Sequence, residues 1–176
     1  MIASEGEKTE PRYFALFNDA SVIHVRCLKW RGDNSPDQVL RRMEQYLEDE
    51  EIRNSDEAWL VVDRDQWSEQ QLAHLHRWAQ GADNYGFALS NPKFEYWLLL
   101  HFEDGTRGRT SNECSRRLKR HLPGYDKDVH GRKFPRESIV LAVNRAEQRD
   151  TPPCVDWPRR PGQTTVYRLV RKLLSQ

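Results

Sequence analysis

Long apolar segments are absent from the sequence, and no stretch approaches the roughly 18 consecutive apolar residues of a membrane span. The first residues, Met1–Glu5, reach an acidic side chain before the apolar region of a signal peptide can form. The three cysteines, Cys27, Cys114 and Cys154, lie far apart and fit neither a zinc-binding spacing nor a disulfide framework. We therefore expect a cytoplasmic protein in a reducing compartment, with no membrane partner.

Several motifs of nucleotide and nucleic-acid recognition are also missing. The sequence contains no glycine-rich phosphate-binding loop of the Walker or dinucleotide type, which argues against an enzyme that handles free nucleotides. It contains no helix-turn-helix, zinc or aromatic RNA-binding signature, so a sequence-specific reader of nucleic acid is not expected. With 176 residues, 37% of them hydrophobic, the chain can form one domain, or one domain with a substantial appendage.

The formal net charge of +1 conceals an acidic first part and a basic second part. Residues 1–106 contain 11 Lys and Arg and 20 Asp and Glu, a formal charge of −9. Residues 107–176 contain 17 and 7, a formal charge of +10. An acidic region suits cation binding, and a basic region suits a polyanion. Charge runs are commonly solvated faces, but a reversal of this size favours a nucleic-acid partner.

Strand and helix patterns alternate through the first ninety or so residues. Apolar runs predict strands at residues 1–4, 22–28, 58–63 and 85–89. Helix-start signals and apolar residues at helical spacing predict three helices between them, around residues 10–17, 36–47 and 69–80. We therefore expect an α/β fold, in which a four-stranded parallel sheet has right-handed crossovers and helices on both faces.

The remaining sequence predicts a mainly helical extension. A nearly all-apolar helix follows the fourth strand, with Asn91 as its cap and Pro92 as its first residue, and runs to Phe102. Three further helical patterns occur around residues 110–122, 137–147 and 164–173. We expect an α/β core at residues 1–102 and a basic helical extension at residues 103–176, packed on that core.

Two acidic residues, Asp63 and Asp65, follow the most apolar of the predicted strands. Ligands of open α/β sheets bind at the carboxyl ends of the strands, and a divalent cation relieves the repulsion between two carboxylates there. An Asp-x-Asp sequence also occurs in ordinary turns and helix caps, although the next helix has its own cap at Ser68. If the strands at 1–4 and 58–63 are neighbours, Glu5 joins the two aspartates at one edge of the sheet.

Two other charged residues each allow two interpretations. Glu95 either occupies an ordinary first-turn position of its apolar helix or reaches the predicted metal region. Lys8 either contacts a phosphate or is a solvated residue near a helix start.

Four blocks of sequence, taken in order, resemble the RloB family. The blocks are residues 5–14, 61–65, 90–102 and 164–170, so the resemblance spans nearly the whole chain. RloB proteins resemble the Toprim superfamily, the catalytic domain of topoisomerases, primases and OLD-type nucleases. The resemblance implies a compact Rossmann-like sheet, magnesium-dependent phosphodiester chemistry and a role in bacterial defence against phage. It also implies an ATPase partner encoded alongside.

The resemblance assigns roles to four acidic residues. Glu5 takes the place of the Toprim glutamate after the first strand, and Asp63 and Asp65 take the place of the Asp-x-Asp motif. These three are the implied catalytic residues, and Glu10 resembles a further metal-binding acid of OLD-type sites. Together the four would hold Mg²⁺ or Mn²⁺, which suit carboxylate and water oxygens. Relatives have a longer first strand, whereas only four residues precede Glu5 here.

The leading hypothesis is a magnesium-dependent nuclease that cleaves DNA or RNA as a phage-defence effector. The alternative is a non-catalytic nucleic-acid-binding or regulatory subunit of an ATPase-containing defence complex. In either case basic side chains would hold the nucleic-acid backbone without reading its sequence. The residues predicted to make these contacts are Lys8, Arg107, Arg109, Arg116, Arg117, Lys119, Arg120, Arg132 and Lys133.

Overall fold

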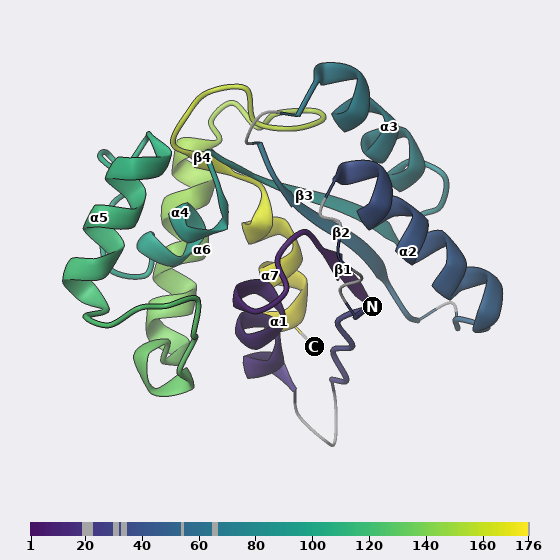
Figure 1. Ribbon diagram of the computed structural model, residues 1–176, viewed down its shortest axis with the longest axis horizontal. Helices are drawn as coiled ribbons and strands as arrows, with labels where there is room; N and C mark the ends of the chain where they lie inside the picture. The colour runs from purple at the N-terminus through teal and green to yellow at the C-terminus, as the bar shows by residue number, and fades with distance from the viewer. Residues whose placement is uncertain (19–22, 30–31, 33–34, 54, 65–66, 176) are drawn as a thin grey trace.

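The strands lie in the order β1-β2-β3-β4 in a single sheet (Figure 1). Our computed structural model describes residues 1–18, 23–29, 32, 35–53, 55–64 and 67–175. The strands are β1 (Ile2–Ser4), β2 (Ala58–Asp63), β3 (Tyr85–Asn91) and β4 (Gln163–Thr164). β1, β2 and β3 are parallel, and β4 is antiparallel to β3. The mostly parallel four-stranded sheet confirms the expected α/β fold.

The composition of the sheet differs from the prediction at both edges. The described part of the predicted strand at 22–28 forms no strand, but isolated bridges occur at Ile23 and at Cys27, which pairs with Ile2. The neighbouring strand β1 is three residues long, so it offers few main-chain groups for pairing. At the other edge β4 supplies the fourth strand, and its pairing with Asn91 extends β3 to the residue predicted as the helix cap, so α4 begins only at Phe94.

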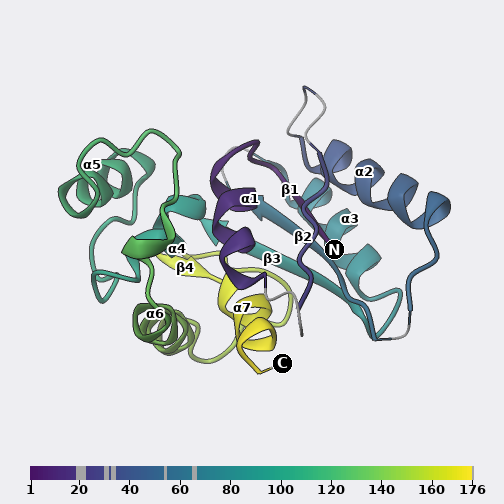
Figure 2. The same ribbon diagram turned by 90° about the horizontal axis from the view of Figure 1, so that it is seen from below.

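Helices cover both faces of the sheet, as predicted (Figures 1 and 2). The seven helices in the described residues are α1 (Thr9–Phe14), α2 (Pro36–Asp49), α3 (Glu69–Ala79), α4 (Phe94–Leu99), α5 (Ser111–His121), α6 (Arg136–Arg149) and α7 (Val166–Leu174). Helices α2 and α3 lie on one face, and α1, α4, α6 and α7 lie on the other. None of the helices in these residues is long and apolar enough to cross a membrane.

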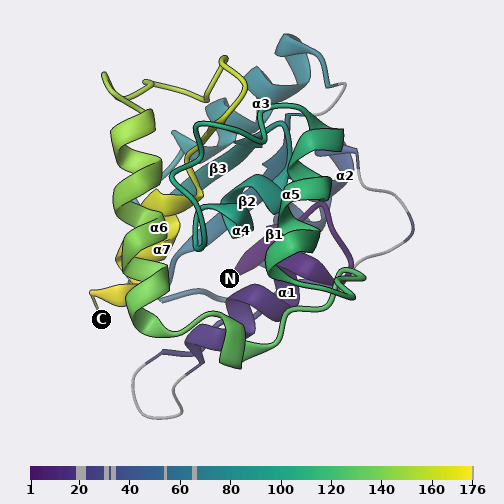
Figure 3. The ribbon, with the colours of Figure 1, turned by 90° about the vertical axis from the view of Figure 1, so that its left-hand side faces the viewer.

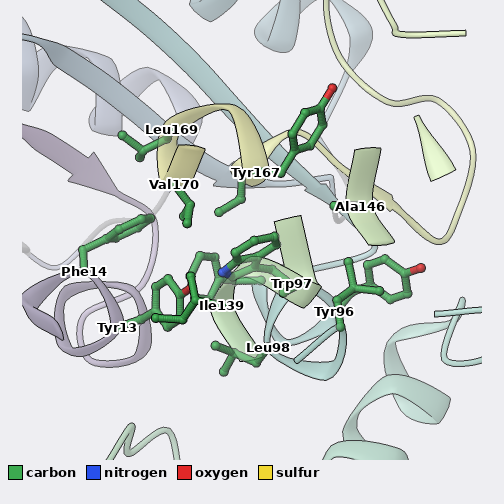
Figure 4. Close-up of a cluster of buried hydrophobic side chains, with 14 of the residues drawn as sticks. Tyr13, Phe14, Tyr96, Trp97, Leu98, Ile139, Ala146, Tyr167, Leu169 and Val170 are labelled. Carbon is green, nitrogen blue, oxygen red and sulfur yellow. The ribbon is translucent and has the colours of Figure 1, made fainter. Parts of the chain in front are cut away.

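Alternation along β2 explains the two-sided core, because successive side chains of a strand point to opposite faces. Leu60 belongs to the apolar cluster that contains residues of α2 and α3. Val61 belongs to the cluster built by α1, α4, α6 and α7, whose side chains converge in Figure 4. Both side chains are buried, at 0% and 1% exposure. The continuous apolar run therefore reflects a strand that is covered on both faces.

A buried polar contact fixes α1 against α4. The Tyr13 hydroxyl lies 3.1 Å from His101 Nε2, and His101 Nδ1 lies 3.1 Å from the carbonyl oxygens of Trp97 and Leu98. Because carbonyl oxygens only accept, Nδ1 carries the proton and Tyr13 donates to Nε2. Burial lowers the pKa of His101 to about 3, so the ring is neutral at ordinary pH. This contact holds the end of α1 near the end of α4.

The second part of the chain wraps around α4. Figure 3 views the molecule from the side of α5 and α6 and shows α4 between them, and α4 packs against both helices. α7 packs against both α6 and β3. The proline-rich stretch before α7 returns the chain to the sheet, because Gly162 N donates to the carbonyl oxygen of Asn91 at 2.8 Å.

Candidate functional site

The carboxyl ends of β1 and β2 border a pocket of about 380 Å³. Acidic and basic side chains from several segments share its wall. The lining residues are Glu5, Gly6, Glu7, Lys8, Thr9, Glu10, Asp63, Lys93, Phe94, Glu95 and Lys127. We call Glu5, Glu10, Asp63 and Glu95 the acid cluster. Its members come from the β1–α1 connection, α1, the end of β2 and the first turn of α4.

Strand register brings Glu5 and Asp63 together. Ser4 pairs with Val61 in the parallel ladder, and the Glu5 N–H donates to the Val61 carbonyl at 3.0 Å. Glu5 Oε2 in turn accepts from the Asp63 N–H at 3.0 Å. The strands at 1–4 and 58–63 are therefore neighbours, which was the condition for Glu5 to lie beside the acids that follow the second of them. The third predicted acid, Asp65, lies outside the described residues.

The residues after β2 help to hold the Glu5 carboxylate. Trp67 Nε1 donates to Glu5 Oε2 at 3.2 Å. Arg64 donates to the Trp67 carbonyl and, at 2.8 Å, to Glu69 Oε1 at the start of α3. Arg64 thus acts as a structural residue that orders the segment carrying Trp67.

Asp63 carries an energetically costly charge. Its Oδ1 accepts from the Phe94 N–H at 2.7 Å, which links the end of β2 to the start of α4. Burial raises the pKa of Asp63 well above its usual range, and the nearby carboxylates of Glu10, Glu5 and Glu95 raise it further. Repulsion within the acid cluster is therefore only partly offset by the Phe94 hydrogen bond.

Glu10 is the most enclosed helical acid of the cluster, with 4% of its surface exposed. Its Oε1 accepts from the Gly6 N–H at 3.0 Å. Burial raises the pKa of Glu10 to about 7, and the charge of Glu95 adds to the shift. A Cβ at position 6 would lie 2.0 Å from Glu10 Oε2, so any residue larger than glycine there requires the Glu10 carboxylate to move.

Glu95 lies beside the other acids, as one of its two interpretations allowed. The Tyr125 hydroxyl donates to Glu95 Oε1 at 3.4 Å and lies 3.2 Å from the Thr9 hydroxyl. The loop after α5 is thereby attached to α1 at the pocket. The same loop carries Lys127, a non-glycine residue with a positive φ of 58°.

The donor chemistry of the acid cluster fits a hard divalent cation, although the described residues form no ready-made ligand set. Within the residues that the structure describes, no three His, Cys, Asp or Glu side chains are arranged to hold one metal ion. Mg²⁺, however, is commonly bound through one or two carboxylates and several waters. A cation would also relieve the repulsion that raises the pKa values of Asp63 and Glu10.

Three lysines lie among the pocket residues. Lys8, which the sequence singled out, is exposed before α1. Lys93 and Lys127 were not predicted. Lys93 belongs to the RloB-like block at 90–102, directly after Asn91 and Pro92, and that position was the available signal. Lys127 lies in a loop whose path only the folded chain reveals.

The other predicted nucleic-acid contacts lie in the second part of the chain and are mostly exposed. The exposed residues are Arg107, Arg109, Arg116, Lys119, Arg120, Arg132 and Lys133. Arg117 differs from them, because its Nε donates to Glu103 Oε2 at 2.7 Å and its side chain is only 16% exposed. We therefore infer that Arg117 attaches α5 to the loop that contains Glu103. The exposed basic residues of α5 are Arg116, Lys119 and Arg120.

A family model described as RloB-like protein matches residues 1–173. The chain belongs to the RloB-like family. Comparisons with curated proteins and with solved structures gave no match. The family match covers both the acid cluster and the helical second part of the chain, so both belong to the RloB-like architecture.

Substitution of Glu10 by glutamine should stabilise this RloB-like protein when no metal is present. A carboxyl group whose pKa is raised on folding favours the folded state at low pH, and that contribution is lost as pH rises from 4.5 to about 7. At about pH 8 the free energy of unfolding of the Glu10→Gln variant should therefore be about 2–3 kcal/mol larger than that of the unmodified chain. Denaturant titrations in a chelator should show the difference falling below about 1 kcal/mol at about pH 5. If the variant and the unmodified chain have equal unfolding free energies at both pH values, the charge of Glu10 does not destabilise the fold.

Proposed function

We propose that this RloB-like protein is a Mg²⁺- or Mn²⁺-dependent nuclease that cleaves phosphodiester bonds of DNA or RNA. The observation that carries the proposal is the juxtaposition of Glu5 and Asp63 at adjacent strand ends, with Glu10 and Glu95 in the same pocket. Lysines at the rim supply the charge that an anionic backbone requires. A role as a phage-defence effector, with an ATPase partner, is supported by the family resemblance.

The acids of the pocket have distinguishable tasks. Glu5 and Asp63 would hold the metal with Glu10, and Asp65 follows in the same motif. When bound, the metal supplies an activated water and stabilises the leaving oxygen. Burial raises the pKa of Glu10 to about 7 when no metal is bound, so a bound cation would displace its proton near neutral pH. The Asp63 main-chain N–H and the Trp67 N–H keep the Glu5 carboxylate in place.

The decisive experiment is a cleavage assay on the full chain. Plasmid DNA and transfer RNA are incubated separately with the protein in Mg²⁺, in Mn²⁺ and in excess chelator. Cleavage of at least one substrate is expected with metal, and none with chelator. Calorimetric titration with each metal alone should show binding that weakens as pH falls through about 7, because protons compete for Glu10 and Asp63. Products formed equally well in chelator would exclude a metal-dependent reaction at this site.

A second candidate function is a non-catalytic binding or regulatory subunit of an ATPase-containing complex. It is favoured by the lack, within the described residues, of three side chains arranged around one ion. Such a subunit should hold nucleic acid equally well in Mg²⁺ and in chelator and release no product. The same assay, with a gel-shift measurement added, separates the two functions.

A further inference from the structure

Lys93 has a fixed place at the acid cluster. It immediately precedes α4 and lines the same pocket as Glu5, Glu10, Asp63 and Glu95. The next residue, Phe94, donates its N–H to Asp63 Oδ1 at 2.7 Å. The backbone of Lys93 is therefore tied to the end of β2, and its side chain starts from a defined point beside the acids.

The ammonium group of Lys93 binds a neutral hydroxyl. Lys93 Nζ donates to Ser115 Oγ on α5 at 2.6 Å, and the lysine is partly buried. In the described part of the chain Lys93 forms no ion pair, despite its acidic surroundings. A phosphate oxygen attracts an ammonium group more strongly than a serine hydroxyl does, because both partners are charged.

The acid cluster by itself would repel a nucleic-acid phosphate, so a positive side chain has to accompany the cation. Lys8 and Lys127 also line the pocket, but both are exposed. Lys93 is the partly buried member of the three and the one whose ammonium is held in place by a neighbouring helix. An ordered lysine positions an anion at a smaller entropic cost than a mobile one.

We propose that Lys93 binds the substrate phosphate at the pocket and exchanges its hydrogen bond to Ser115 for one to a phosphate oxygen. This inference rests on the proposed function, since it requires a nucleic-acid strand at the acid cluster. Because Ser115 and Lys119 lie one turn apart on α5, the exchange places the bound phosphate beside the basic side chains of that helix. In the alternative, structural role, the hydrogen bond between Lys93 and Ser115 would only connect the start of α4 to α5.

The binding test uses a fluorescent single-stranded oligonucleotide and the full chain in the Asp63→Asn background, at constant Mg²⁺ and varied NaCl. Loss of one phosphate contact lowers the slope of log Kd against log salt by about 0.7 for a single strand. Lys93→Met is expected to show this decrease and about tenfold weaker binding at low salt. Lys93→Arg should restore the slope. Ser115→Ala should leave it unchanged.

The control variant is Lys172→Met, which removes a lysine paired with Glu57 at a different pocket. It should leave the slope unchanged. In the unmodified background, Lys93→Met should lower kcat/KM, and Ser115→Ala should not. An unchanged slope in Lys93→Met would overturn the inference, as would a loss of equal size in Ser115→Ala. If the parent chain binds no oligonucleotide and cuts none, the proposed function itself fails and this inference falls with it.

Discussion

Replacing Asp63 with asparagine is expected to reduce metal-dependent cleavage by about a thousandfold, because the substitution removes a charge that would hold the metal. The fold should survive. The asparagine carboxamide oxygen can still accept the Phe94 N–H that Asp63 Oδ1 accepts at 2.7 Å. Burial and neighbouring acids raise the pKa of the Asp63 carboxyl group, so its charge destabilises the fold. Thermal stability in chelator should therefore be unchanged or increased when the charge is removed. Single-turnover cleavage and melting curves on the same preparations measure both effects.

The matched control for Asp63→Asn is Asp83→Asn, an exposed acid in the turn between α3 and β3. This turn lies at the amino end of β3, whereas the pocket lies at the carboxyl ends of the strands. Cleavage by Asp83→Asn should equal that of the unmodified chain. If Asp63→Asn cuts as fast as this control while its melting curve shows a folded protein, the acid cluster is not the catalytic site.

The proximity of Glu5 and Asp63 could be predicted because it follows from local rules. Each residue ends an apolar run, and the carboxyl ends of parallel neighbouring strands meet at one edge. Glu10 was predicted as a site residue only from the family resemblance, because its spacing from Glu5 in the sequence does not show that the two side chains are close. Glu95 stayed open, since a first-turn glutamate is stable whether or not other acids lie nearby.

The remaining features depend on contacts that leave no pattern in the sequence. The strand β4 has two residues and is defined by main-chain bonds to β3, such as Thr165 N to the Leu89 carbonyl at 2.9 Å. Such bonds place little constraint on side-chain type. Lys127 lines the pocket from a loop that is joined to α1 by the Tyr125–Thr9 and Asp128–Arg12 contacts, between segments more than a hundred residues apart. The sequence could therefore predict three parallel strands, the first two acids and Lys8, but not β4, Lys93 or Lys127.

Substitution of Gly6 by alanine is expected to lower cleavage by about a hundredfold without changing any charge. The new Cβ would lie 2.0 Å from Glu10 Oε2 and 2.6 Å from its Cδ, so the carboxylate must move. Displacement of a catalytic group by about 1 Å costs roughly this factor in rate. The clash should also lower the melting temperature, because the 4% exposed Glu10 side chain has little space into which it can turn.

A double-mutant cycle with Glu10→Ala tests whether the effect of Gly6→Ala arises at this contact. Glu10→Ala removes the atoms that the new Cβ would meet, so Gly6→Ala should cause little further loss of stability or cleavage in that background. The coupling between the two substitutions should therefore be nearly as large as the effect of Gly6→Ala alone. Additive effects would show instead that alanine at position 6 disturbs the β1–α1 connection itself. In that case the placement of Glu10 against Gly6 would not be what limits cleavage.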